Sequence, residues 1–94
     1  MSEQLTAQHF LPHVNKIFRV RDGRHALTLS RVETMRAGGG PREQFNLIFT
    51  GPPRDVLAEG LYTLDVDDGP HFELYVIPVH TPTLDRQDYQ AAFN

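Results

Sequence analysis

The segment His71–Val79, with the sequence HFELYVIPV, decides how the rest of this chain is read. It is the longest nearly unbroken apolar run, and the alternation of an extended strand would place its side chains on two opposite faces. One face would carry Phe72, Leu74 and Val76, and the other Tyr75, Ile77 and Val79. A strand that is apolar on both faces is expected to be covered on both, as a central strand between two layers or at a subunit contact.

The composition restricts the classes of function that the chain can have. Its 94 residues are expected to form a single β-rich domain, 1–94, with a modest core. Twelve acidic side chains outnumber nine basic ones, which argues against a nucleic-acid-binding surface. The absence of cysteine excludes disulfides, thiolate metal sites and a cysteine nucleophile. The sequence MSEQLTAQ lacks the features of a signal peptide, and no apolar segment is long enough to span a membrane, so we expect a soluble, cytoplasmic protein.

Alternating apolar residues predict five further strands. They are Lys16–Arg21, His25–Arg36, residues 44–50, Tyr62–Val66 and Tyr89–Asn94. Along the second of these, Val32 falls out of phase with Leu27 and Leu29, and a β-bulge near Ser30 and Arg31 would return it to the inner face. In the third, Phe45, Leu47 and Phe49 would point inward, with Ile48 as an apolar exception on the outer side.

The segments between the strands carry turn signals. Thr6 can cap a short helical turn that ends near Pro12, and Leu5 and Phe10 have the spacing of a hydrophobic staple. Asn15 can adopt the left-handed backbone conformation, which asparagine tolerates better than most residues do. Asp22-Gly23 and residues 67–70 predict tight turns, and Ala37–Pro41 a flexible loop. Residues 54–59 predict a turn in which Val56 or Leu57 plugs one end of the fold.

Together these features predict an all-β, mainly antiparallel fold. It would be a small six-stranded sandwich or partly open barrel with one short N-terminal helical turn.

The spacing of these residues resembles that of a known family. The motifs are Phe45-x-Leu47-x-Phe49-x-Gly51-Pro52, Leu57-x-x-Gly60-x-Tyr62-x-Leu64, residues 74–79 and the C-terminal Tyr89–Asn94. They resemble a bacterial domain of unknown function, DUF6916, over nearly the whole chain, although Asn15 stands where a glycine is expected. The resemblance implies no catalytic residues. It implies that such proteins accompany phage-tail-like collar or fibre proteins, which suggests a structural or assembly role.

No motif specifies a catalytic, metal or cofactor site. His9 and His13 have the helical spacing of two zinc ligands, but Pro12 lies between them and would break the helix. His71 and His80 flank the central strand and would lie at its opposite ends. The run from Asp65 to Gly69 is explained by a hairpin turn without calcium. We therefore expect no enzyme and no cofactor.

Two groups of residues are candidates for an interface. Arg19, Arg21 and Arg24 concentrate positive charge in the first hairpin, which would meet an acidic partner surface unless these side chains simply pair across strands. Tyr75, Ile77 and Val79 would form an exposed apolar patch unless the N-terminal turn covers them.

The expected function is thus a non-enzymatic module for protein interaction, self-association or assembly into a phage-tail-like or other multi-protein structure. It would bind neither nucleic acid nor membrane. The alternative is a small-ligand-binding β-barrel with Phe45, Phe49, Tyr62 and Phe72 around an apolar pocket.

Overall fold

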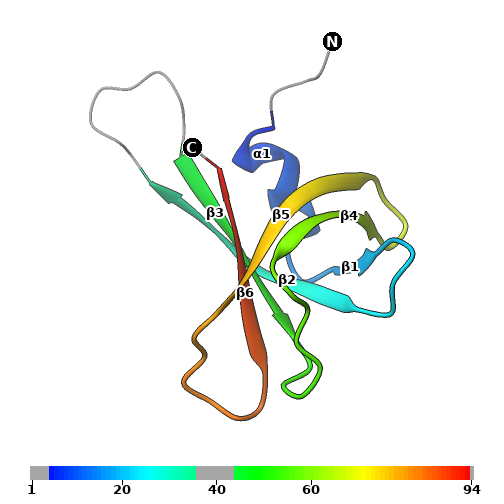
Figure 1. Cartoon of the computed structure of the whole chain (residues 1–94). Coiled ribbons are helices and arrows are strands. Elements are labelled where there is room, and N and C mark those ends of the chain that lie inside the picture. The colour runs from blue at the N-terminus through cyan, green and yellow to red at the C-terminus, as the bar shows by residue number, and fades with distance from the viewer. Residues whose placement is uncertain (1–4, 36–43, 94) are drawn as a thin grey trace.

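Six antiparallel strands close into a barrel whose one end carries a short helical segment (Figure 1). The computed structural model describes residues 5–35 and 44–93. Its elements are α1 (Ala7–Phe10), the 3-10 turn η1 (Leu11–His13), β1 (Ile17–Val20), β2 (Ala26–Met35), β3 (Gln44–Gly51), β4 (Gly60–Val66), β5 (His71–Val79) and β6 (Gln87–Phe93). Around the barrel the strands follow the order β1-β2-β3-β6-β5-β4. The predicted all-β, antiparallel class is confirmed, and the barrel is closed rather than partly open.

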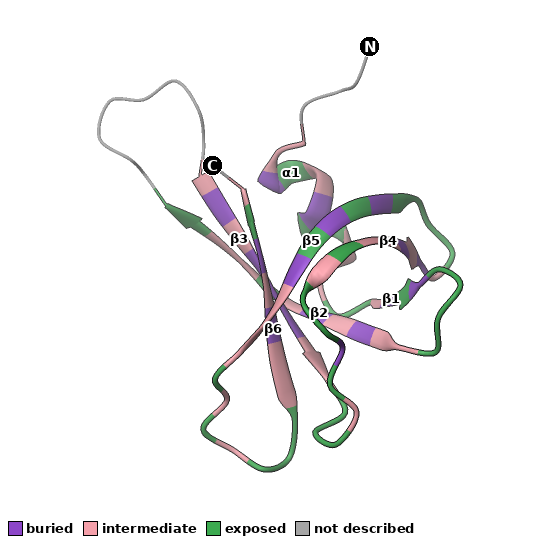
Figure 2. Ribbon diagram, in the orientation of Figure 1, coloured by how far each residue is buried: buried purple, intermediate pink, exposed green. Residues whose placement is uncertain are grey.

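The inner faces of the strands form one hydrophobic core. Figure 2 shows buried residues alternating with exposed ones along β5. The largest fully buried side chains are Tyr89, Phe10, Phe18, Phe45, Phe49, Leu27, Leu29, Leu47, Leu64, Leu74 and Val76. The alternating apolar side chains of β1 and β4 belong to this cluster, namely Phe18, Val20, Leu64 and Val66, and Tyr62 packs against it. Period-two alternation therefore identified the core correctly.

The predicted bulge in β2 is present. Leu29 pairs with Phe49 and Arg31 with Ile48, so the register shifts by one residue at Ser30. Beyond the shift, Val32 pairs with Leu47 and packs against the core. The extra residue thus lets a ten-residue strand keep its apolar side chains on the inner face on both sides of the bulge.

The predicted turns are confirmed where they are described. Asn15, Asp22 and Asp68 have positive φ angles of 74°, 63° and 57°, the left-handed region that Asn and Asp tolerate. The N–H of Gly23 donates to the Val20 carbonyl, and the N–H of Gly69 donates to the Val66 carbonyl. The predicted loop Ala37–Pro41 and the terminal Asn94 lie outside the described residues.

The helical segment closes one end of the barrel through Phe10. The α-helix ends at Phe10 and continues as the 3-10 turn that contains Pro12. The Phe10 ring lies 4.5 Å from that of Phe72, 5.6 Å from Phe93 and 5.9 Å from Phe45, centroid to centroid. Phe10 is fully buried, so α1 closes the end of the barrel between β3, β5 and β6.

Leu57 is buried near the other end of the barrel. It is 6% exposed, whereas the neighbouring Val56 is 49% exposed, so the predicted end plug is Leu57. The backbone N–H of Leu57 donates to the buried hydroxyl of Tyr89 over 2.8 Å. Burial raises the pKa of that hydroxyl. The bond fastens the 52–59 turn to β6.

Removing that acceptor is expected to destabilise the fold. Tyr89→Phe leaves the buried Leu57 N–H without its partner and should lower the free energy of unfolding by about 1–3 kcal/mol in urea titrations. Tyr62→Phe is the matched control, because its hydroxyl donates to the Ala58 carbonyl at an exposed position where water can replace it. The control should change stability by no more than about 0.5 kcal/mol. Equal losses in the two variants would contradict the role given to Tyr89.

The expectation that β5 is covered on both faces is corrected at Tyr75, which is 49% exposed, whereas Ile77 and Val79 on the same face are half-buried. The N-terminal turn packs through Phe10 at the barrel end instead of lying over Tyr75. Conversely, Ile48 on the outer side of β3 is only 8% exposed. It stands in register between Arg31 of β2 and Gln90 of β6, which flank it on both sides.

Candidate functional site

The outer face of β5 carries exposed apolar side chains. Tyr75 is 49% exposed, and its cross-strand neighbour on β4, Leu61, is 62% exposed. Ile77 and Val79, farther along β5, are half-buried. We call Leu61, Tyr75, Ile77 and Val79 the β5 outer surface. The Tyr75 hydroxyl donates to the Glu59 carboxylate, and this bond raises the pKa of Tyr75.

Leu61 was not among the residues singled out from the sequence, although a signal for it was present. It lies two and four residues before Thr63 and Asp65, which the alternation of β4 places on the outer face. Its parity therefore assigns it outward as well. That it stands beside Tyr75 depends on the pairing of β4 with β5 and could not be read from either strand alone.

The three arginines of the first hairpin each form an ion pair within the chain. Arg19 Nε lies 2.8 Å from Asp67 Oδ1, Arg21 Nη2 lies 2.6 Å from Asp65 Oδ1, and Arg24 Nη2 lies 2.7 Å from Asp55 Oδ1. Hydrogen bonds from Arg21 and Arg24 lower the pKa values of their Asp partners. Carboxylates of the same chain therefore neutralise the positive charge of these three arginines.

The fold separates the two groups of candidate interface residues. Strand β4 lies between β1, which carries Arg19, and β5, which carries Tyr75. In the strand register, Arg19 stands opposite Asp65, and Asp65 stands opposite His71. The arginines of the first hairpin therefore lie across β4 from the polar first residues of β5. The pair of Leu61 and Tyr75 lies farther along these strands. The apolar and basic candidates thus form two distinct areas.

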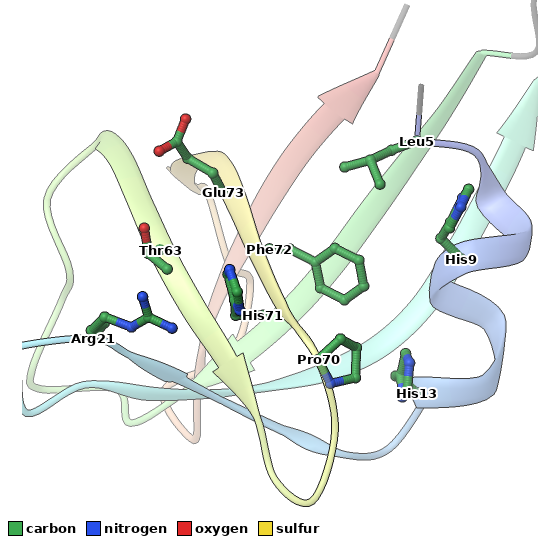
Figure 3. A pocket seen from close by; sticks show the side chains of 9 residues that line it. All are labelled: Leu5, His9, His13, Arg21, Thr63, Pro70, His71, Phe72 and Glu73. Carbon is green, nitrogen blue, oxygen red and sulfur yellow. The ribbon is translucent and has the colours of Figure 1, made fainter. Parts of the chain in front are cut away.

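A groove of about 800 Å³ separates the helical segment from the first half of β5. Figure 3 shows Leu5, His9 and His13 on the helical side, His71 and Glu73 on β5, and the Phe72 ring pointing between them. Arg21, Thr63 and Pro70 complete its lining. The sequence relates His9 to His13 and His71 to His80, but it does not predict this groove, because nothing local indicates that α1 lies beside β5.

His9, one of the groove histidines, has a structural role at the helical turn. The Nδ1 atom of His9 accepts a hydrogen bond from the Thr6 N–H over 3.0 Å, as a Glu does in a capping box. Burial and the nearby Lys16 lower the pKa of His13. Within residues 5–35 and 44–93, no group of three His, Asp or Glu side chains is placed to hold a metal ion. His80 lies just beyond the far end of β5.

The aromatic residues proposed for an internal ligand pocket fill the barrel. Phe45, Phe49 and Phe72 are all buried. Phe49 contacts the Phe18 ring edge to face at 5.2 Å, and Phe45 stacks on Phe93 at 4.5 Å. Tyr62 is half-buried and bonds to Ala58. A smaller depression of about 300 Å³ opens on the surface between residues 53–54 and 81–87.

Comparisons with known proteins place the chain in a family without assigning a role. Among the described helices, none has the length and apolar character that crossing a membrane requires. Neither the curated proteins nor the solved structures gave a match. One family model matches residues 5–93, which is nearly the whole chain, and it is described as a domain of unknown function. This protein therefore belongs to the DUF6916 family.

Proposed function

We propose that this protein is a non-enzymatic interaction or assembly module whose contact surface is the β5 outer surface. The observation that carries the proposal is the exposed pair Leu61 and Tyr75, which stand directly opposite each other on neighbouring strands. Ile77 continues the apolar character along β5. An apolar patch on a barrel whose other outward positions are largely polar marks a contact with another protein more often than it marks chance exposure.

The packing of the interior favours this function over ligand binding inside the barrel. The rings of Phe10, Phe18 and Phe49 are completely buried, and ring contacts run through the core from Phe10 by way of Phe72 and Phe18 to Phe49. A ligand of drug size would need several hundred Å³ of internal space. Side chains already occupy the region that the alternative assigned to a ligand.

The arginines fit a supporting role in this proposal. Because Arg19, Arg21 and Arg24 already neutralise Asp67, Asp65 and Asp55, a partner gains little by adding acidic groups there. Apolar burial is then the main source of affinity, and charge serves orientation. A place within a multi-protein structure, such as a phage-tail-like particle, is the setting that the family resemblance suggests.

The first partner to test is a second copy of the chain. Sedimentation velocity over a wide range of concentrations should show a dimer or larger species for the wild type. The double variant Leu61→Ser/Tyr75→Ser should weaken association by about 100-fold, since it removes two apolar anchors. Leu84→Ser is the matched control, because Leu84 is 93% exposed and lies in the loop after β5. A wild type that keeps the mass of one chain throughout would contradict self-association.

A further inference from the structure

Among residues 5–35 and 44–93, none pairs with one edge of β5 over the first half of the strand. Strand β6 pairs with β5 only at Ile77, Pro78 and Val79, the last three residues of β5, and Figure 1 shows the earlier part of β5 turning away from β6. No backbone hydrogen bond from the described residues reaches the segment 71–76 from the side of β6. A strand edge of this kind presents N–H and C=O groups in the pattern that another strand can pair with.

The hydrogen-bond register identifies which residues face that open edge. The N–H of Arg21 donates to the Thr63 carbonyl on the β1 side of β4, and the N–H of Val66 donates to the Pro70 carbonyl on the β5 side. Because bonded and non-bonded pairs alternate in an antiparallel ladder, Phe72, Leu74 and Val76 bond to β4. His71, Glu73 and Tyr75 must then direct their backbone groups away from β4, toward the edge.

The groove described above runs beside this edge, so the open edge of β5 forms one side of a groove whose other side is the helical segment. Phe72 forms its floor, and Leu5, His9 and His13 form the wall opposite β5 (Figure 3). The five residues from His71 to Tyr75 span about 13 Å, enough for a short extended segment. A second copy's β5 does not fit there, because its own edge is flanked by its own helical segment. The groove therefore suits a free extended peptide.

The charge of Glu73 indicates what such a peptide carries. Four carboxylates lie on the described strands, and three of them pair with arginines: Glu33 with Arg31, Asp65 with Arg21 and Asp88 with Arg86. Glu73 is exposed on the groove and has no such partner among the described residues. A basic side chain directly across the edge would give Glu73 an ion-pair partner, since opposite charges stabilise cross-strand pairs.

We infer that the edge of β5 from His71 to Tyr75 is a docking site for an extended peptide that places Lys or Arg opposite Glu73. The peptide would extend the sheet as an added strand, with alternate apolar residues turned toward Phe72 and Leu5. This site goes beyond the proposed function, because it uses backbone groups of β5 and leaves the side chains of the β5 outer surface free. Either site can therefore fail without the other.

The first experiment tests the edge in the free protein. In hydrogen exchange followed by NMR at low protein concentration, the amides of Phe72, Leu74 and Val76 should exchange at least about tenfold more slowly than those of His71, Glu73 and Tyr75. Equal protection of the two sets would overturn the inference. Protection of the second set that rises with protein concentration would assign the edge to a second copy and would also overturn it.

The second experiment tests the occupant with a designed probe. The acetylated, amidated pentapeptide TVKVT can place its lysine opposite Glu73, its valines inward and its threonines opposite His71 and Tyr75. It should bind saturably, shift the amide resonances of those three residues, and bind about tenfold more tightly than TVEVT. Glu73→Lys should reverse this preference, whereas Asp85→Lys, in the loop before β6, should leave it unchanged.

The probe also has a control for backbone pairing. Methylation of the lysine amide nitrogen in TVKVT removes a donor that the added strand needs, so binding should be lost. No saturable binding of the unmodified probe, equal affinity for the lysine and glutamate probes, or retained binding of the methylated probe would each overturn the inference. Leu61→Ser should bind the probe like the wild type, which separates this site from the β5 outer surface.

Discussion

Phe10→Ala is expected to lower the free energy of unfolding by about 3–5 kcal/mol, the cost of truncating a large buried aromatic side chain. Phe10 is fully buried and contacts the rings of Phe72, Phe93 and Phe45 at the barrel end. These three side chains come from three different strands, so the cavity would open between β3, β5 and β6 at the barrel end. In a domain of this size that loss is a large part of the total stability.

The experiment needs a control for the helical segment itself. Leu11 is adjacent in sequence but 45% exposed, and Leu11→Ala should cost no more than about 1 kcal/mol. Both variants are compared with the wild type by urea unfolding, with far-UV circular dichroism and near-UV absorbance of the tyrosines as two probes. A loss below about 1 kcal/mol for Phe10→Ala would show that α1 is not an integral part of the core.

Phe10 also shows where sequence reasoning reached its limit. Its spacing from Leu5 and the proline at position 12 predicted the helical turn correctly, because capping and helix termination depend on local chemistry. The position of that turn at the barrel end depends on contacts with strands 35 or more residues away. No local pattern encodes such a contact, so the sequence leaves open whether the turn covers the outer face of β5.

The strands show the opposite case. The alternation of Phe45, Leu47 and Phe49, and the broken phase at Val32, were sufficient to predict a buried face and a bulge. Both follow from the two-residue period of a strand, which is a local property. Closure of the barrel was not predicted, because it requires β1 to pair with β4, and that pairing depends on the twist of the whole sheet.

The candidate interface depended on both kinds of information. The outward position of Tyr75 and Ile77 could be predicted from parity, and so could that of Arg19 and Arg21. Their partners could not: the carboxylates of Asp67 and Asp65 lie more than 40 residues away in sequence from the arginines that they bind. The groove beside β5, and the lack of an arginine partner for Glu73 within the part of the chain that the structure describes, likewise appear only when the strands are placed next to one another.

The second large effect is expected from two neighbouring residues of β5 that face opposite ways. Leu74 is 1% exposed and Tyr75 is 49% exposed. Leu74→Ala should lower the free energy of unfolding by about 2–5 kcal/mol, because it creates a cavity in the core. Tyr75→Ala should cost no more than about 1 kcal/mol for a single chain, since its side chain is half in solvent and its bond to Glu59 is exposed.

Repeating the two unfolding measurements at several protein concentrations makes the comparison a test of assembly as well. A contact formed only by the folded state adds stability that grows with concentration. If the β5 outer surface joins two copies, the cost of Tyr75→Ala should rise with concentration while that of Leu74→Ala stays constant. A large cost of Tyr75→Ala at every concentration would instead mean that the chain itself covers Tyr75, and the interaction surface proposed for β5 would be wrong.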